Sequence, residues 1–315
     1  MSASREAPKT GRPLDSPDRA WLTMSERGSV LGIRFLFFLC LVAGRSVVRA
    51  VLRPVLFYYL VTHRLARQAS RKYLERILSN VTWRTIYRHF LRFGDVTLDR
   101  AFFLQGRYSL FDCPPGNGFE HILKLQRERR GAILLGAHLG SVEAMRSLGG
   151  ADSLPLYVVA HTGNARILNS FMEKLNPALA GRILEVTPGG INALLQIKEL
   201  IDAGNLVAIL GDRVGFNEKA VTVEFLGKAA RFPTGAYLLS AMCDCPVYLT
   251  FGLFEPPNRY EFFCEPFLPE GLQLPRADRE GILTAQAQRF AARLEAYCRK
   301  SPLNWFNFYD FWAAT

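Results

Sequence analysis

The sequence lacks the short motifs that identify several common enzyme classes. It has no GxxxxGK[ST] loop, no GxGxxG turn and no GxSxG elbow. Only six cysteines occur, none in a CxxC pair, and the five histidines complete no zinc-ligand spacing. These absences argue against nucleotide-binding, structural-zinc and serine acyl-enzyme chemistry. We therefore expect no resident cofactor or metal. Cys243 and Cys245 lie among apolar residues and are expected to be small core side chains, and the cysteine pattern favours a reducing compartment.

Long apolar runs are scarce as well. The segment VLGIRFLFFLCLVAG at residues 30–44 is interrupted by Arg34, and fifteen residues fall short of the roughly 20 that a spanning helix needs. A second run, PVLFYYLV, covers residues 54–61. No clear cleavage site follows the first run, so a signal peptide is not expected.

Positive charge is abundant and unevenly placed. The formal net charge is +11, and residues 21–76 contain ten Lys or Arg against two acidic residues. On a helical wheel the arginines of this region fall within about 120° of one another: Arg27, Arg34, Arg45, Arg49, Arg53, Arg64, Arg67 and Arg71. Beside so many Phe, Leu, Val and Tyr residues, this pattern favours a helix in the lipid headgroup region.

Two other interpretations of the basic segment stay open, namely a helix packed on the protein's own core and a tilted membrane span. Nucleic acid is a weaker partner, because the aromatic residues form apolar blocks and not isolated stacking platforms.

The remaining pattern predicts an α/β fold with a mixed, mostly parallel sheet flanked by helices. Short apolar runs at residues 132–136, 156–160, 182–186 and 206–210 alternate with helical patterns, and further strands are expected at 221–225, 246–251 and 260–264. Residues 63–105 and 278–298 are predicted to be helical. The expected organisation is a disordered tail (1–20), a helical, basic, membrane-associating segment (21–105) and an α/β domain (106–315).

His138 and Glu143 are the predicted catalytic pair. His138 follows the apolar run that ends at Gly136, and active sites in open α/β sheets gather at the carboxyl ends of strands. A histidine near neutral pKa suits removal of a hydroxyl proton, and a carboxylate on its other ring nitrogen would fix the tautomer. Gly140 permits the tight turn that this requires.

Five further polar residues are candidates for substrate binding. Asn164 and Arg166 follow a predicted strand and precede a helix, where a headgroup or phosphopantetheine phosphate could bind. Arg213 could meet a phosphate or a developing oxyanion. Arg231 precedes Pro233 and a predicted helix, and we expect it to contact substrate. Asp212 follows the predicted strand at 206–210.

Several segments together resemble the bacterial lipid A late (lauroyl/myristoyl) acyltransferases. They are HLGSVE at 138–143, like that family's H-x4-E motif, GDRVG at 211–215, and VEFLGKAARFPTGAYLLSAMCDCPVY at 223–248. The resemblance covers residues 22–312 and implies acyl transfer from acyl carrier protein or coenzyme A to a lipid or glycolipid hydroxyl. It also implies an inner-membrane location, on the cytoplasmic face, and places Asp212 near the catalytic histidine or the acceptor.

The chain departs from the lipid A enzymes at two places. Ser141 and Val142 replace the usual Asn-Trp pair of the motif, and the terminus NWFNFYDFW at 304–312 has six aromatic residues in nine. This terminus is more similar to an aryl-polyene-associated subgroup. A thioesterase or lipid hydrolase of the same fold and a non-catalytic lipid-binding protein are the alternatives.

Overall fold

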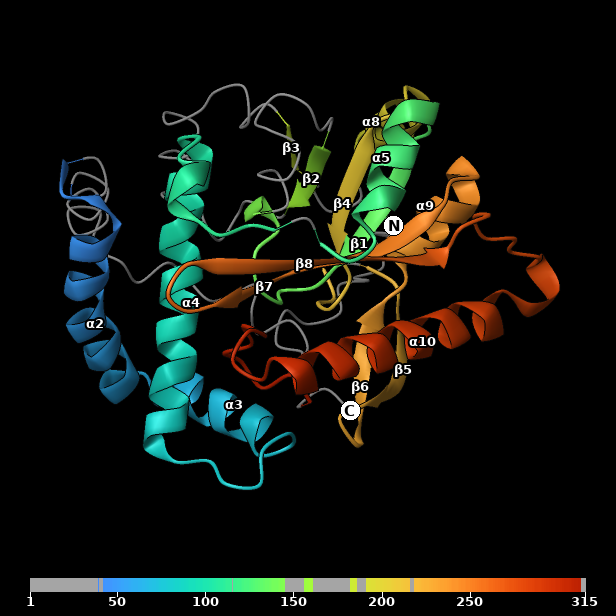
Figure 1. The fold of residues 1–315 in the computed structure, drawn as a ribbon. Helices are drawn as coiled ribbons and strands as arrows, with labels where there is room; N and C mark the ends of the chain where they lie inside the picture. Colours follow the sequence, from blue (N-terminus) through green and yellow to red (C-terminus); the bar gives the residue numbers. More distant parts are fainter. Residues whose placement is uncertain are drawn as a thin grey trace, which may run out of the picture.

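A six-stranded sheet forms the centre of the protein, in the order β3-β2-β4-β1-β7-β8 (Figure 1). The structure is a computed structural model and describes residues 39, 42–114, 116–144, 156–160, 182–185, 191–215 and 218–312. The strands are β1 (Ala132–Gly136), β2 (Leu156–Ala160), β3 (Ile183–Glu185), β4 (Leu206–Leu210), β7 (Val247–Glu255) and β8 (Arg259–Leu268). The predicted tail at 1–20 lies outside the described residues.

The predicted fold class is confirmed. Every pairing from β3 to β7 is parallel, and β8 pairs with β7 in the antiparallel direction. Two elements were not predicted, α5 (Phe119–Glu128) and β6 (Lys228–Pro233), which forms a hairpin with β5 (Ala220–Phe225). Among the described residues, the other α-helices of the α/β part are α8 (Ile191–Asp202), α9 (Gly235–Cys243) and α10 (Arg279–Lys300).

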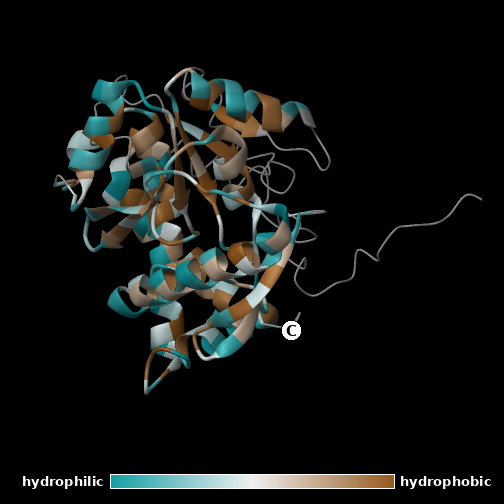
Figure 2. Cartoon of the chain, turned by 90° about the vertical axis from the view of Figure 1, so that its right-hand side faces the viewer, coloured by the Kyte–Doolittle hydropathy of each residue, from teal (hydrophilic) through white to brown (hydrophobic). Residues whose placement is uncertain are grey.

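Alternation along β1 explains why helices cover both faces of the sheet. Ile133 and Leu135 lie in one core cluster with side chains of α8, α9 and α10, whereas Leu134 lies in another with Ile122 and Leu125 of α5. Successive strand residues point to opposite faces, so an uninterrupted apolar strand needs an apolar partner on each side. Hydrophobic segments accordingly lie in the central strands, with mixed segments along the surrounding helices (Figure 2).

The described part of the N-terminal region contains three α-helices, α2 (Gly44–Thr62), α3 (Arg64–Leu74) and α4 (Trp83–Leu104). The single helical stretch predicted for 63–105 is thus broken. Thr82 accepts a hydrogen bond from the backbone of Thr85 and forms a capping box with it, which starts α4 as a new helix. Side chains of α3 and α4 share a core cluster with the sheet.

Two ion pairs join α2 to α4 and correct the interpretation of the arginine stripe. Arg45 donates to both carboxylate oxygens of Asp99 at 2.6 and 2.8 Å, and Arg49 does the same to Asp95 at 2.7 and 2.9 Å. Tyr260 of β8 also donates to Asp99. Where phosphate was expected to meet these two guanidinium groups, α4 supplies carboxylates instead. Arg27 and Arg34 of the stripe lie outside the described residues.

The outward face of α2 is apolar instead. Val47, Val55, Tyr58 and Val61 recur at helical spacing and are exposed, Tyr58 to 68%, and Leu65 at the start of α3 continues the row. Among the described helices, none combines the length and the apolar character required to cross a bilayer.

We predict that Arg45→Ala lowers the free energy of unfolding by about 3–5 kcal/mol, because it leaves the buried Asp99 carboxylate without its cation. Urea unfolding measures this. Arg71→Ala is the control, since its pair with Glu75 is more than half exposed and should contribute only about 0–1 kcal/mol. Equal losses for the two variants would contradict the role given to the α2–α4 pairs.

Candidate active site

The pairing of β1 with β4 brings two polar residues together at the carboxyl edge of the sheet. The two strands run parallel with Gly136 opposite Leu210. His138 and Asp212 each lie two residues beyond these strand ends, and a hydrogen bond from Gly211 N to the Gly136 carbonyl extends the register towards them. The sheet therefore places the two side chains next to each other.

His138 and Asp212 are hydrogen-bonded through both side chain and backbone. The Nδ1 of His138 lies 2.8 Å from Asp212 Oδ1, and the His138 backbone N–H is 3.1 Å from both carboxylate oxygens. The indole N–H of Trp305 donates to Oδ2 at 3.0 Å. Asp212 is 1% exposed, so these donors replace the water that a buried carboxylate would otherwise need.

The pKa values of the pair favour an ionised carboxylate beside a neutral imidazole. Burial opposes the charge on Asp212, but His138, Arg213 and the Trp305 hydrogen bond outweigh it and lower the pKa of Asp212 to about 2. Desolvation and repulsion by Arg213 lower the pKa of His138 below its usual value, although Asp212 works in the opposite direction. Because an ionised carboxylate only accepts, Nδ1 carries the proton and Nε2 keeps its lone pair.

The loop after β1 is fixed by backbone contacts on both sides. Gly140 N donates to the Asn304 carbonyl at 2.9 Å, Ser141 N to the Gly252 carbonyl at 2.8 Å, and Phe306 N to the His138 carbonyl at 2.8 Å. Gly140 has φ +71°, and a Cβ atom there would collide with the Gly252 carbonyl oxygen. Only glycine fits this turn, but the turn does not bring Glu143 to His138 as predicted.

Glu143 does not occupy the position predicted for it. Its carboxylate forms an ion pair with Arg100 of α4 and accepts a hydrogen bond from Ser141 at 3.4 Å, while Asp212 takes the Nδ1 position. The reason is the path of the chain. Gly140 pairs with Gly252 of β7 before the next helical turn starts, so the loop does not fold straight back on His138.

The other predicted site residues have different surroundings. Arg213 donates to the Phe306 carbonyl at 2.7 Å and lies over the Tyr309 ring, so it holds the C-terminal segment. Arg231 lies on β6 opposite Thr222 of β5. Asn164 and Arg166 fall outside the described residues, and their roles stay predictions.

A comparison with protein families gives the class of enzyme to which the protein belongs. The sequence profile of the bacterial lipid A biosynthesis acyltransferases matches residues 48–313. The chain belongs to this family. A search of curated proteins found no match. The chain is thus a member of an acyltransferase family, and its His138–Asp212 pair is the candidate base of an acyltransferase.

Sequence reasoning missed two contributors to this candidate site. Arg100 lies near the C-terminal end of α4, and Trp305 lies in the aromatic C-terminal segment. Neither belongs to a short motif, and both reach the site from elements far away along the chain. The aromatic richness of residues 304–312 was visible in the sequence, but it did not indicate which ring contacts the site.

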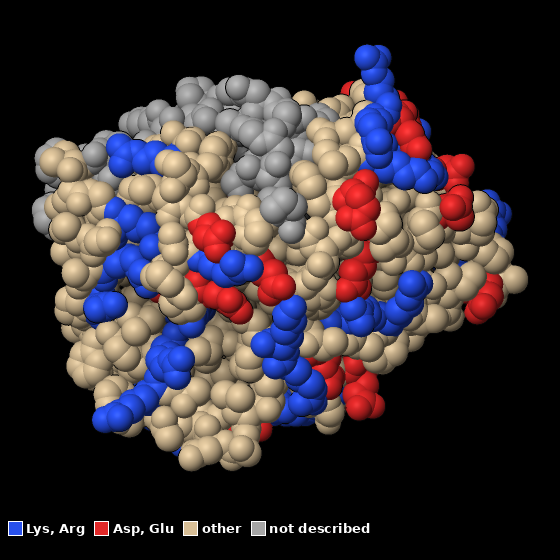
Figure 3. Space-filling model, in the orientation of Figure 1, with Lys and Arg blue, Asp and Glu red and all other residues tan. Residues whose placement is uncertain are grey.

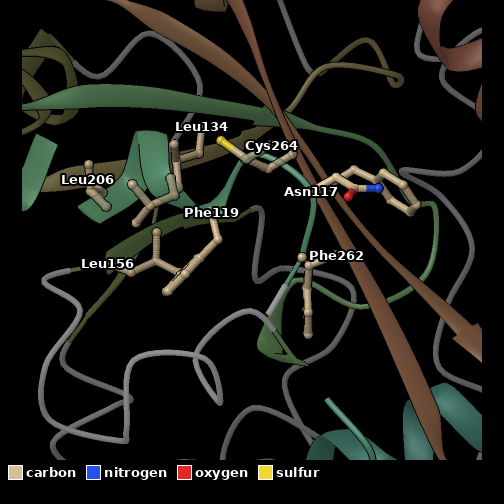
Figure 4. Close-up of a pocket in the computed structure, with 11 residues that line it drawn as sticks. Asn117, Phe119, Leu134, Leu156, Leu206, Phe262 and Cys264 are labelled. Carbon is tan, nitrogen blue, oxygen red and sulfur yellow. The ribbon is translucent and has the colours of Figure 1, made fainter. Parts of the chain in front are cut away.

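A small apolar pocket lies between α5 and the sheet (Figure 4). Phe119, Leu134, Leu156 and Leu206 line one side of it, and Phe262 of β8 also contributes. Its volume of about 30 Å³ has room for only a few water molecules. A fatty acyl chain does not fit there unless these side chains move.

We predict that the rate of acyl transfer stays constant from neutral pH to below pH 6.5 and falls only when His138 becomes protonated. The lowered pKa of His138 gives this direction, because the neutral form is the base. Arg213→Gln removes a repelling cation, so its acidic limb should move to higher pH. A wild-type limb at or above pH 6.5, or an unchanged limb in Arg213→Gln, would contradict the assignment.

Proposed function

We propose that the protein is a membrane-associated O-acyltransferase with His138 as general base and Asp212 as the carboxylate that orients it. The acyl donor is a thioester of acyl carrier protein or coenzyme A, and the acceptor is a hydroxyl of a lipid or glycolipid. The observation that supports this most strongly is the 2.8 Å contact between His138 Nδ1 and a buried carboxylate of Asp212.

The geometry allows a direct transfer in which atoms and charges balance. The Nε2 of His138 removes the hydroxyl proton of the acceptor as its oxygen bonds to the thioester carbon. The C–S bond then breaks, and the imidazolium returns the proton to the leaving thiolate. The Asp212 carboxylate stabilises the imidazolium between these steps, without taking the proton itself.

Glu143 has a supporting part in this proposal. Its ion pair with Arg100 and its hydrogen bond from Ser141 connect the loop after β1 to α4. In addition, Ser141 Oγ accepts from the backbone N–H of Ala144 at 3.2 Å. Replacement of Glu143 should therefore loosen the loop but leave the hydrogen bond between His138 and Asp212 in place.

We further propose that the protein attaches to the cytoplasmic face of the bacterial inner membrane through the outward face of α2. The exposed side chains of Val55, Tyr58, Val61 and Leu65 form an apolar row suited to the interfacial zone of a bilayer. Lys and Arg side chains lie on the same side of the molecule, over α2 and α4 (Figure 3). They suit anionic lipid and also an acidic acyl carrier protein.

Within the family, we infer that the chain is closer to the aryl-polyene-associated subgroup than to the lipid A enzymes. The support is the substitution at Ser141 and Val142 and the aromatic segment 304–312. An acceptor panel of lipid A precursors, other glycolipids and aryl-polyene lipids tests this. Transfer confined to lipid A precursors would contradict it.

We predict that His138→Ala and Asp212→Asn each lower the rate of acyl transfer by about 10²–10⁴, whereas Glu143→Gln has a smaller effect because it removes no contact to His138. The measurement is formation of acylated lipid from acyl-carrier-protein or acyl-coenzyme-A thioester and a lipid acceptor. Circular dichroism checks that the variants are folded.

The products of the same assay separate the alternatives. Free fatty acid without acylated lipid, with acceptor present, would identify a hydrolase and contradict transfer. Near-normal transfer by His138→Ala would exclude His138 as the base. A loss with Glu143→Gln as large as with Asp212→Asn would overturn the choice of Asp212.

We predict that Tyr58→Asp and Val61→Asp each weaken binding of the full-length chain to vesicles of phosphatidylethanolamine and phosphatidylglycerol by roughly tenfold or more, because each puts a charge in place of buried apolar surface. Vesicle co-sedimentation measures this. Leu195→Asp on α8 is the matched control, since Leu195 is also exposed, to 54%. Equal weakening by all three variants would refute attachment through α2.

A further inference from the structure

The segment 304–306 passes between the loops that carry His138 and Asp212. Asn304 accepts from the Gly140 backbone, Phe306 donates to the His138 carbonyl, and Leu139 forms an antiparallel bridge with Trp305. Arg213 donates to the Phe306 carbonyl. The C-terminal segment is thus bonded to both loops of the candidate site.

Trp305 is the member of this segment that reaches the carboxylate. Its side chain is fully buried, and its indole N–H lies 3.0 Å from Asp212 Oδ2, while Oδ1 faces His138 Nδ1. The two oxygens of Asp212 therefore have different side-chain partners, and the His138 backbone N–H lies 3.1 Å from both of them. Without the indole donor, the carboxylate would lose one of the contacts that fix its orientation, and it would keep more negative charge opposite the imidazole.

The position of Trp305 is itself determined by buried neighbours. Its ring packs edge-on against Tyr73 at 4.8 Å and Phe225 at 5.3 Å between ring centroids. Its carbonyl accepts from Nε2 of His89 at 2.9 Å, and the Nδ1 of His89 lies 2.8 Å from Ser70 Oγ. Burial lowers the pKa of His89 to about 4, so this histidine stays neutral. Its single ring N–H is on Nε2 and donates to the Trp305 carbonyl.

We propose that Trp305 is a positioning residue for His138, which acts by holding the Asp212 carboxylate in a single orientation and sharing its negative charge. A charge-assisted hydrogen bond withdraws charge from the carboxylate, so the indole weakens the pull of Asp212 on a protonated imidazole. The other groups that act on this pair are Arg213, beside Asp212, and the Cys298 thiol of α10. The effect of Trp305 on the rate of acyl transfer rests on the proposed function, but its effect on the pKa of His138 does not.

The test compares Trp305→Phe with Trp312→Phe in the full-length chain. Trp312 is a matched control because it lies in the same segment, is 3% exposed and also donates one hydrogen bond, to the Phe225 carbonyl at 3.2 Å. Both variants lose one indole N–H from the same aromatic cluster. Only Trp305→Phe removes a donor from Asp212.

Without substrate, NMR titration of ¹³C-labelled histidine should give a higher pKa for His138 in Trp305→Phe than in wild type, and no change in Trp312→Phe. With acyl thioester and acceptor, kcat should fall about tenfold in Trp305→Phe with KM unchanged, as expected for loss of one hydrogen bond to a charged group. Equal His138 pKa values in the two variants would overturn the proposal.

The proposal stays falsifiable in two unfavourable cases. If wild type has no transferase activity, the NMR titration still decides the role of Trp305, so its failure and that of the proposed function are distinguishable. If Trp305→Phe does not fold, the wild-type indole ¹H–¹⁵N resonance of Trp305 takes its place. It should shift as His138 titrates, and a resonance that ignores this titration would overturn the proposal.

Discussion

The hydrogen bonding of one buried carboxylate, that of Asp212, determines the rest of the site. Asp212 is 1% exposed, and burial of an ionised carboxylate destabilises the fold unless hydrogen-bond donors replace the lost water. Here the compensation comes from the His138 imidazole, the His138 backbone and the Trp305 indole. Each donor lies on a different part of the chain from Asp212 itself, so the carboxylate joins the loop after β1, the loop after β4 and the C-terminal segment.

The helical N-terminal region participates in the same arrangement. His89 of α4 bonds to the Trp305 carbonyl, and Arg100 of α4 pairs with Glu143. The helix is in turn held to α2 by Arg45 and Arg49. These arginines leave the apolar side of α2 facing outward, and a contact between that side and a membrane would bring lipid acceptors to the protein surface.

Sequence patterns predicted the sheet and the position of His138. The family resemblance placed Asp212 near the catalytic histidine or the acceptor, but the sequence did not predict that Asp212, and not Glu143, contacts Nδ1 of His138. Apolar runs of strand length are visible directly, and a polar residue just after one marks a strand end. One neighbour of β1 in the sheet is β4, and Asp212 behind it lies 74 residues after His138. Strand periodicity contains no information on that pairing. Glu143 was chosen for its closeness along the chain, which the turn at Gly140 makes irrelevant. Similarly, the spacing of the arginines placed them on one face of a helix, but it contains no information on which element packs against that face.

The tautomer of His138 tests the central claim most directly. Two-dimensional ¹H–¹⁵N NMR of the histidine ring at neutral pH distinguishes a proton on Nδ1 from one on Nε2. The account predicts the Nδ1–H form in wild type and in Glu143→Gln, and its loss in Asp212→Asn. A wild-type ring protonated on Nε2, or a tautomer that depends on Glu143 and not on Asp212, would contradict it.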